Sequence, residues 1–407
     1  MQHRTPTTPA PHPGPPRHRP RLRPGALALV ATVALGIAAC TPVPGSGGTP
    51  TTTGPTPTTA GPAGPVTNVA VAQTVTGFTT PWEIAFLPDG TPLVTERPGR
   101  VAAVVGGVRT VVGTIPDVVA SGEGGLLGMA VDPDFATNRR IYTCYVSGAA
   151  GTAVDERIVR FRVAEDLGSL TDQTTILAGI PKGASGNRHT GCRLAIGPDG
   201  MLWAGTGDVV QPTLPQDPTS RAGKVLRMTL AGAPAPGNPG GAWDPYVYTL
   251  GHRNVQGLAF RPSDGAAFSV EHGTGCDDEV NRLTAGANFG WNPVGAGGTY
   301  DENAPMTSPG VAGAVPAVWS SGCPTIAPSG AAFVNGSQWG AWNDQLAVAV
   351  LKGSRLMFVR INGSTLVGTD ARLTDKGRLR TVRSGPDGSL WVAQDANPGS
   401  LFRLVPA

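Results

Sequence analysis

Three histidines lie outside the N-terminal 24 residues, and each sits in a glycine-containing turn beside Arg, Asn or Glu. They are His189, His252 and His272, and because all three lie in such turns we predict that they serve a single polar site. His189 comes one short glycine turn before an alternating apolar segment, residues 193–196, that ends in a Pro-Asp-Gly turn. An imidazole at a strand entrance stands outside the core, and imidazoles exchange protons near neutral pH, so His189 is a candidate general base. The alternative is that it only hydrogen-bonds the backbone of its turn.

Other polar and charged residues occur in comparable turns, and we expect the fold to bring them into one pocket. They are Glu123, Arg193, Arg253, Asn254, Glu271, Asp277, Asp278, Lys352, Arg378 and Arg380. A cluster of arginine and lysine repels itself unless it binds an anion, so we predict a ligand with several carboxylates or phosphates. The alternative is that each arginine pairs at the surface with an acid of its own repeat. This is less expected for Arg378 and Arg380, because alternate residues of a strand project on the same face.

Residues 271–279 combine a glycine-rich turn with three consecutive acids, Asp277, Asp278 and Glu279. Backbone carbonyls beside carboxylates are the oxygen ligands that hard cations such as calcium prefer. The alternating Asp/Asn spacing of an EF-hand is absent, and a solvated acidic loop is the alternative. The chain has no dinucleotide-binding glycine fingerprint, no Gly-x-Ser-x-Gly turn and no His-Glu-x-x-His motif, which disfavours a nucleophilic hydrolase.

Composition and a recurring pattern predict the elements that must position these residues. The chain has 58 glycines, 40 prolines and only 14% charged residues, which favours an all-β fold. An alternating apolar segment that leads into a Pro-Asp-Gly turn or a relative occurs six times, at residues 82–90, 127–135, 193–200, 257–265, 329–336 and 382–388. Such repeats indicate a six-bladed β-propeller, with residues 67–76 as an outer strand that closes the ring. The loops that enter the innermost strands would then meet at the mouth of a central channel.

The N-terminal 66 residues have the composition of an export signal and a tether. The first 24 residues hold five arginines and no acid, residues 24–39 are uncharged and mostly apolar, and Cys40 follows. We interpret residues 1–39 as a lipoprotein signal peptide and Cys40 as the lipidated residue; an ordinary signal peptide with a chance cysteine is the alternative. We expect residues 40–66 to form a disordered Thr/Pro/Gly linker and residues 67–407 to form the propeller. The protein is expected to be exported, and either lipid-anchored on the outer face of the cell membrane or secreted.

Net charge and cysteine count add two expectations. Five of the 31 basic residues lie in the leader, so the rest of the chain, with 28 acidic residues, is slightly acidic, and we predict no nucleic-acid partner. Four cysteines follow Cys40, namely Cys144, Cys192, Cys276 and Cys323. In an exported protein they suggest two disulfides with three possible pairings, of which we expect Cys144 with Cys192 and Cys276 with Cys323.

Ordered motifs extend from about Pro81 to the C-terminus. They include Thr95-Glu96-Arg97-Pro98-Gly99-Arg100, Glu123-Gly124-Gly125-Leu126-Leu127-Gly128, Gly207-Asp208, Gly251-His252-Arg253-Asn254, Glu271-His272-Gly273, Asn288-Phe289-Gly290-Trp291, Leu351-Lys352-Gly353 and Arg378-Leu379-Arg380. With His189 and Arg193, these motifs resemble the soluble quinoprotein glucose and sorbosone dehydrogenases. Members of that family are six-bladed propellers that oxidise aldoses with pyrroloquinoline quinone (PQQ) and calcium.

The resemblance implies a role for each matching residue. His189 would be the base that takes the proton of the anomeric hydroxyl while hydride passes to the quinone. Arg253 and Asn254 would contact the quinone oxygens, and Arg253 would also stabilise the charge that develops. The other implied contacts are Lys352, Arg378 and Arg380 with the cofactor carboxylates, His272 with the cofactor, the carbonyls of Gly273 and Thr274 with calcium, and Glu123 with the substrate. Arg188 departs from the pattern, because the glucose-oxidising enzyme has an acidic sugar contact at that position.

We therefore expect a PQQ- and calcium-dependent enzyme that oxidises aldose sugars at the anomeric carbon to lactones and passes the electrons to an external acceptor. The alternative is a non-catalytic propeller that binds carbohydrate or another anionic ligand. A calcium-dependent lactone hydrolase would need an inner ring of Asn, Asp and Glu ligands, which we do not find in the sequence.

Overall fold

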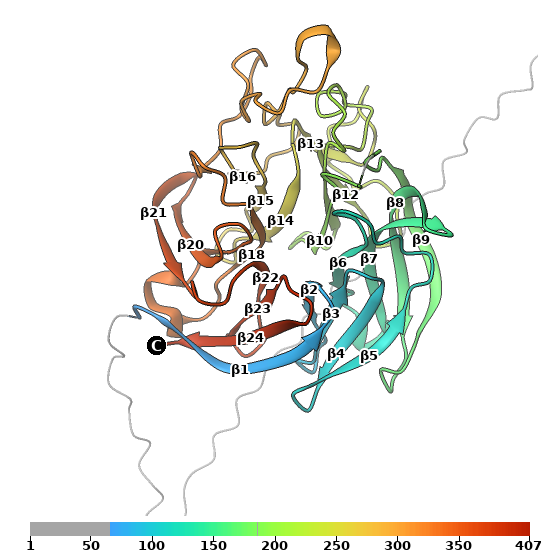
Figure 1. The fold of residues 1–407 in the computed structure, drawn as a ribbon, viewed down its shortest axis with the longest axis vertical. Helices are drawn as coiled ribbons and strands as arrows, with labels where there is room; N and C mark the ends of the chain where they lie inside the picture. The colour runs from blue at the N-terminus through green and yellow to red at the C-terminus, as the bar shows by residue number, and fades with distance from the viewer. Residues whose placement is uncertain (1–65, 185) are drawn as a thin grey trace, which may run out of the picture. The chain divides into compact units, whose positions relative to one another are not determined.

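The structure is a computed structural model that describes residues 66–184 and 186–407. The predicted signal peptide, Cys40 and all of the predicted linker except Val66 lie outside these residues. Within them, six four-stranded antiparallel sheets are arranged as blades around a common centre (Figure 1). The predicted all-β fold, a six-bladed propeller, is confirmed.

Each blade is ordered outward from the centre. The innermost strands are β2 (Pro81–Phe86), β6 (Leu126–Val131), β10 (Gly191–Ile196), β14 (Val255–Phe260), β18 (Pro328–Phe333) and β22 (Leu379–Ser384). The second strands are β3 (Pro92–Glu96), β7 (Arg140–Ala149), β11 (Leu202–Thr206), β15 (Ala267–Glu271), β19 (Leu346–Val350) and β23 (Leu390–Gln394). The third strands are β4 (Arg100–Val105), β8 (Thr152–Val163), β12 (Lys224–Met228), β16 (Glu279–Arg282), β20 (Arg355–Asn362) and β24 (Gly399–Pro406). The outer strands are β5 (Val108–Thr114), β9 (Leu170–Ile180), β13 (Val247–Leu250), β17 (Trp319–Ser320), β21 (Thr365–Arg372) and β1 (Val69–Phe78).

The ring is closed by pairing the first strand with the last. Strand β1 is antiparallel to β24, in a register that runs from Val69 opposite Pro406 to Phe78 opposite Gly399. The predicted closing strand is thus confirmed, two residues further along the chain than expected. Strand β1 completes a blade built from the C-terminal strands, so the outer edge of β24 is paired and not exposed.

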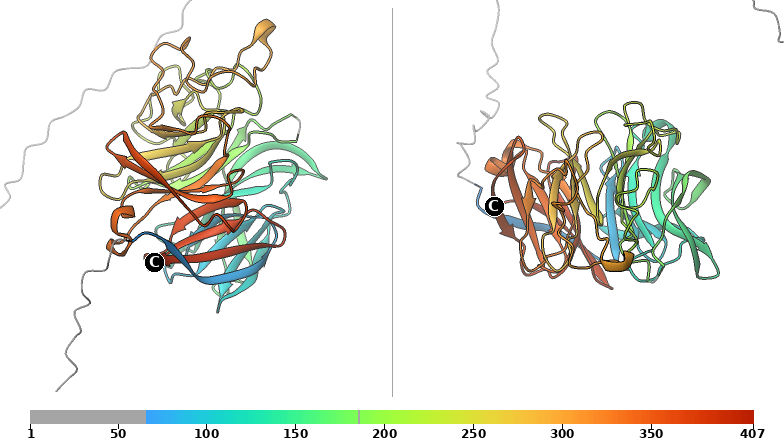
Figure 2. Two further views of the ribbon diagram at one scale, coloured as in Figure 1. Left: turned by 60° about the vertical axis from the view of Figure 1, so that its left-hand side comes forward. Right: turned by 90° about the horizontal axis from the view of Figure 1, so that it is seen from above.

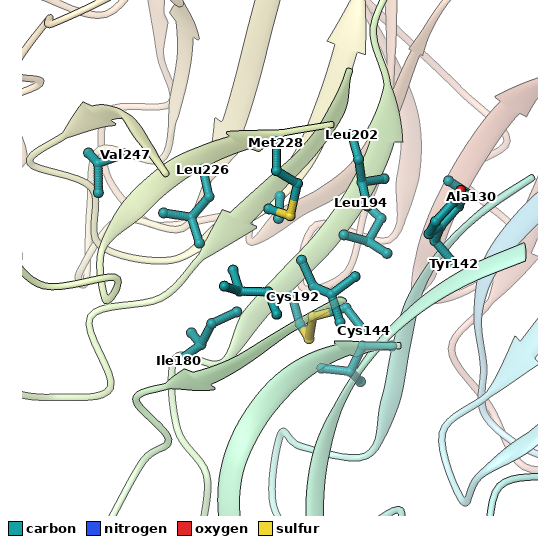
Figure 3. Close-up of a cluster of buried hydrophobic side chains, with 14 of the residues drawn as sticks. Ala130, Tyr142, Cys144, Ile180, Cys192, Leu194, Leu202, Leu226, Met228 and Val247 are labelled. Atoms are coloured by element: carbon teal, nitrogen blue, oxygen red, sulfur yellow. A yellow bond between two sulfur atoms is a disulfide. The ribbon is translucent and has the colours of Figure 1, made fainter. Parts of the chain in front are cut away.

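Apolar residues fill the spaces between neighbouring blades. One cluster includes Leu194, Leu226 and Met228 and surrounds the disulfide between Cys144 of β7 and Cys192 of β10, which joins two adjacent blades (Figure 3). The second disulfide joins Cys276 to Cys323, so both expected pairings are confirmed. Inner strands such as β3 are buried along their whole length, since each sheet is covered on both faces.

In the part of the chain that the structure describes, helical structure is limited to α1 (Phe135–Asn138) and two 3-10 turns, η1 (Ala296–Gly298) and η2 (Ser337–Trp342). No helix in residues 66–184 or 186–407 is long and apolar enough to cross a membrane. The connection from β16 to β17, residues 283–318, contains η1 and extends beyond the sheets at one edge of the ring (Figures 1 and 2). This connection supplies part of the site described next.

Candidate functional site

One end of the propeller axis carries a cavity of about 210 Å³. All six blades contribute to it with residues at the entrance of an innermost strand or the end of a second strand, so the predicted convergence of these loops is confirmed. The lining residues are Trp82, Arg97, Glu123, Leu127, Thr190, Gln256, His272, Ala327, Leu351, Arg378, Arg380 and Asp395.

His189 lies beside this cavity in the turn that leads into β10. Its φ of 53° is in the left-handed region, which residues other than glycine rarely adopt. The loop after β11 packs directly on this turn: a Cβ on Gly207 would overlap the carbonyl oxygen of His189, so only glycine fits there. The backbone N–H of His189 donates to Glu123 Oε2 at 2.9 Å. Glu123, predicted as a substrate contact, therefore also fixes the backbone of the candidate base.

A buried carboxylate orients the imidazole of His189. The ring Nδ1 lies 2.7 Å from Asp208 Oδ1, and because a carboxylate only accepts, Nδ1 carries the proton and Nε2 is the proton acceptor. Asp208 Oδ2 also accepts from Trp291 Nε1 at 2.7 Å and from the Tyr300 hydroxyl at 2.6 Å. Burial acts to raise the pKa of Asp208, but the hydrogen bonds from His189 and Tyr300 outweigh it and lower that pKa. This is the geometry of a general base held by an orienting group.

Arg253 reaches the same region from the turn before β14. Its Nη2 donates to Glu302 Oε2 at 3.1 Å and its Nη1 to the carbonyl oxygen of His272 at 3.3 Å. The carbonyl oxygen of Arg253 accepts from the backbone N–H of Asp208 at 2.8 Å. The two catalytic candidates, His189 and Arg253, are therefore held by the same loop.

Three buried polar atoms near the cavity have no hydrogen-bond partner among the described residues. They are Arg253 Nε, Asn254 Nδ2 and His272 Nε2. Burial, together with the charges of Arg380 and Arg253, lowers the pKa of His272 well below its usual value, so the ring is neutral. Buried polar atoms are seldom left unpaired, and guanidinium and amide N–H groups pair with oxygen acceptors. The site therefore fits a ligand rich in oxygen acceptors, such as the predicted anion.

His252 is not part of this site. The side chain is fully buried, with Nδ1 2.8 Å from Glu271 Oε1 and Nε2 2.9 Å from the Thr249 hydroxyl. Glu271 Oε2 in turn accepts the backbone N–H of Arg253 at 2.8 Å. The prediction that all three histidines serve one polar site is wrong for His252, which supports the turn of Arg253 instead.

The predicted cation cluster is brought together only in part. Arg378 and Arg380 both pair with Asp395, at 2.9 and 3.2 Å, and all three line the cavity. Because Asp395 follows β23 in the same blade, the alternative of pairing within a repeat applies to these arginines. Two arginines share one carboxylate, so positive charge remains for an anion. Lys352 is exposed and is not among the lining residues, although its neighbour Leu351 is.

The turn at Gly273 is anchored by Asp278. Asp278 Oδ1 accepts from the Gly273 N–H at 3.0 Å, and Oδ2 accepts from the Ile326 N–H at 2.6 Å. Asp278 is fully buried, so the alternative of a solvated acidic loop is wrong for this residue. Among the residues that the structure describes, no group of three or more His, Cys, Asp or Glu side chains is placed to hold a metal. A cation bound by Gly273 and Thr274 would have to use backbone carbonyls.

Arg193 lies inside the ring and not at the mouth, where it was predicted. It is fully buried, pairs with Glu83, donates through Nε to the Gln256 carbonyl oxygen at 2.6 Å, and stacks 3.9 Å from the Trp82 ring centre. Arg383 binds the same carboxylate at 2.6 Å. A second cavity, of about 360 Å³, is lined by the opposite ends of the innermost strands. The buried pair of Arg193 and Glu83, with Arg383 at the edge of the second cavity, thus separates the two ends of the axis.

Four residues around His189 were not predicted to act there, namely Arg188, Asp208, Tyr300 and Glu302. Tyr300 and Glu302 belong to the irregular connection 283–318, which has no periodic pattern to indicate its course. Asp208 lies just after a second strand, the position that also delivers His272 and Asp395 to the cavity. Polar residues immediately after second strands are therefore the signal that would have found it.

The fold and the site together define a six-bladed propeller with a histidine–aspartate pair beside a cationic cavity. The family model described as Glucose / Sorbosone dehydrogenase matches residues 78–403, so the chain belongs to this family, as its motifs predicted. It is 35% identical over 341 residues to the aldose sugar dehydrogenase YliI of Escherichia coli strain K12, covering 80% of this chain and 90% of that protein.

Two solved structures support the same relationship. The PQQ-bound aldose sugar dehydrogenase of Streptomyces coelicolor is 36% identical, with a TM-score of 0.71 over 84% of this chain and 99% of that one. The apo-form of the soluble aldose sugar dehydrogenase of Escherichia coli is 34% identical, with a TM-score of 0.74 over 84% of this chain and 99% of that one.

Proposed function

We propose that this protein oxidises aldose sugars at the anomeric carbon to lactones, using PQQ and calcium, and passes the electrons to an external acceptor. The observation that supports this most directly is that buried polar atoms of Arg253, Asn254 and His272, beside the Asp208–His189 pair, find no partner in residues 66–184 and 186–407. A proton acceptor next to the unfilled donors of Arg253 and Asn254 suits a reaction in which a hydroxyl loses its proton beside an oxygen-rich cofactor.

The residues present fit PQQ, which carries carboxylates and quinone oxygens. Arg253 and Asn254 would hold the quinone oxygens, and the surplus charge of Arg378 and Arg380 would hold carboxylates, with Lys352 and His272 as further contacts. When bound, the quinone supplies a two-electron acceptor for hydride. The backbone of Arg253 is held on both sides, so its guanidinium is placed to stabilise negative charge on the cofactor.

His189 would move the proton. Its Nε2 accepts the proton of the anomeric hydroxyl, while the Nδ1 hydrogen bond to Asp208 keeps the ring in one orientation. The Asp208 carboxylate stabilises the positive charge that the imidazole then gains. Glu123, which lines the cavity, would contact the sugar.

Calcium would be held by the carbonyl oxygens of Gly273 and Thr274. Support for this comes from the rigidity of the turn, which is fixed by Asp278 and closed by the Cys276–Cys323 disulfide. Carbonyl oxygens are suitable calcium ligands.

The test is reconstitution of the apo-protein with PQQ and calcium. Dye reduction should depend on aldose, and His189→Ala should abolish turnover while leaving the quinone absorption band and its titration midpoint nearly unchanged. Absence of both the band and dye reduction across a panel of sugars would refute the proposal. Quinone binding without turnover on any sugar would favour a non-catalytic propeller.

We also propose that the protein is exported and anchored through a lipid on Cys40, on the basis of the leader sequence. Cys40→Ser should abolish incorporation of labelled fatty acid and release the protein from the membrane fraction. Equal membrane association of the two forms would count against the anchor.

A further inference from the structure

Arg188 and Glu302 form an ion pair on the open side of His189. Arg188 Nη2 lies 2.9 Å from Glu302 Oε1 and 3.5 Å from His189 Nε2, the ring nitrogen that Asp208 does not hold. The other oxygen of Glu302 binds Arg253 at 3.1 Å. Any hydroxyl that donates its proton to Nε2 must therefore lie next to these two side chains, which we call the rim pair.

The rim pair is accessible, unlike the residues behind it. The side chains of Arg188 and Glu302 are 48% and 43% exposed, against 4% for His189 and 7% for Arg253. A guanidinium has five N–H donors, and a carboxylate has about four acceptor sites. The rim pair thus keeps donors and acceptors available to a ligand while its two members hold each other in place.

The charge of the rim pair discriminates between ligands. Burial acts to raise the pKa of Glu302, but hydrogen bonds and charge from Arg188 and Arg253 lower it, so the carboxylate is ionised at neutral pH. If the Arg253 side chain binds a cofactor and leaves Glu302, the negative charge of Glu302 still neutralises the positive charge of Arg188. A sugar hydroxyl both donates and accepts, so it can bond to both members. A carboxylate on the sugar only accepts, so Arg188 attracts it but Glu302 repels it.

We propose that Arg188 and Glu302 determine the charge of the accepted substrate, so that the site takes neutral aldoses and disfavours sugars that carry a carboxylate, such as uronic acids. This inference rests on the proposed function and adds to it a substrate class and the residues that select it.

Glu302→Gln tests the inference, because it keeps the shape of the side chain and removes its charge. The ratio of kcat/KM for glucuronate to that for glucose should rise about tenfold, the size expected for one repulsive contact at a partly exposed site. Adding Arg188→Gln should abolish this gain, since the attracting guanidinium is then missing.

A matched control is available at the far end of β14. Asp264 is 40% exposed and also lies near two arginines, 3.5 Å from Arg261 and 4.0 Å from Arg282. Asp264→Asn should leave the substrate ratio unchanged. If Glu302→Gln does not fold, Arg188→Gln alone keeps the inference testable, because it should lower the same ratio.

PQQ titration followed by absorbance distinguishes failure of the proposed function from failure of the role given to the rim pair. Glu302→Gln should bind PQQ at least as tightly as the wild type, because Arg253 loses a competing partner. Failure of the wild-type protein to bind PQQ or oxidise any sugar would overturn the proposed function. Normal PQQ binding and glucose oxidation by both proteins, with an unchanged glucuronate ratio, would overturn the role of the rim pair alone.

Discussion

Replacement of Asp208 by Asn tests the part that the buried carboxylate plays behind His189. The carboxylate accepts from His189 Nδ1 and Trp291 Nε1 at 2.7 Å and from the Tyr300 hydroxyl at 2.6 Å. When His189 takes a proton, unit charges about 4 Å apart attract by about 4 kcal/mol at an effective dielectric constant of about 20. Loss of that attraction corresponds to a rate about a thousandfold lower. We expect kcat of Asp208→Asn to fall by about that factor.

The assay is dye reduction with saturating PQQ, calcium and glucose, together with PQQ titration and thermal unfolding. KM and the PQQ affinity should change little, because Asp208 contacts neither ligand in the proposed site. Asp217→Asn is a suitable control: Asp217 lies in the same loop and binds only Thr219 through its side chain among the described residues. A folded Asp208→Asn protein whose kcat stays within about tenfold of the wild type would refute the electrostatic role.

Two further substitutions test the support of the site. Gly207→Ala should displace His189, because the added Cβ overlaps the His189 carbonyl oxygen, and kcat should fall about a hundredfold. Gly310→Ala is the control, because there is space for a methyl group at that position. Unchanged turnover in Gly207→Ala would show that the contact between Gly207 and His189 does not position the base. Burial, together with the charge of Glu271, raises the pKa of Glu279 from 4.5 to about 8. The contribution of Glu279 to folding stability is therefore complete below the pKa of the unfolded chain and is lost as pH rises through about 8. The loss is at most about 1.4 kcal/mol per pH unit. Thermal unfolding of Glu279→Gln should therefore depend less on pH than that of the wild type between about pH 5 and 9, and parallel pH profiles would exclude this linkage.

The sequence was sufficient for the architecture because each blade repeats the same local pattern. Alternating strands that end in Pro-Asp-Gly turns define register and spacing, and the ring places every strand entrance at one end. His189, Arg253 and Arg380 were found in this way, since each lies in or just after the turn that enters an innermost strand. The pattern does not predict how far along the propeller axis each side chain lies. Arg193 is two residues inside β10, and its side chain is buried against Glu83 in place of lining the cavity.

The partners of the candidate residues were harder to predict. Tyr300 reaches His189, and Glu302 reaches its neighbour Arg188, from more than one hundred residues away along the chain. Both belong to an irregular connection whose course depends on contacts that local sequence does not encode. Asp395 was missed because pairing of Arg378 and Arg380 depends on side-chain reach across neighbouring strands of one blade. Strand alternation correctly put the two arginines together but gave no indication of the acid between them.

The residues proposed for catalysis lie where two neighbouring blades meet, apart from the residue proposed for selectivity. His189 enters β10 and Arg253 enters β14, and the Asp208 loop ties the two turns together through its backbone bond to Arg253. These contacts use backbone and buried groups, so any change in them alters the base and the arginine at once. Glu302, by contrast, belongs to the connection 283–318 outside the sheets, and it meets the substrate side of His189 through Arg188. Trp291 and Tyr300 of the same connection bind Asp208, so changes there would disturb the pair. Under the proposed function, a substitution at Glu302 should change which sugar is accepted while the Asp208–His189 pair keeps its geometry.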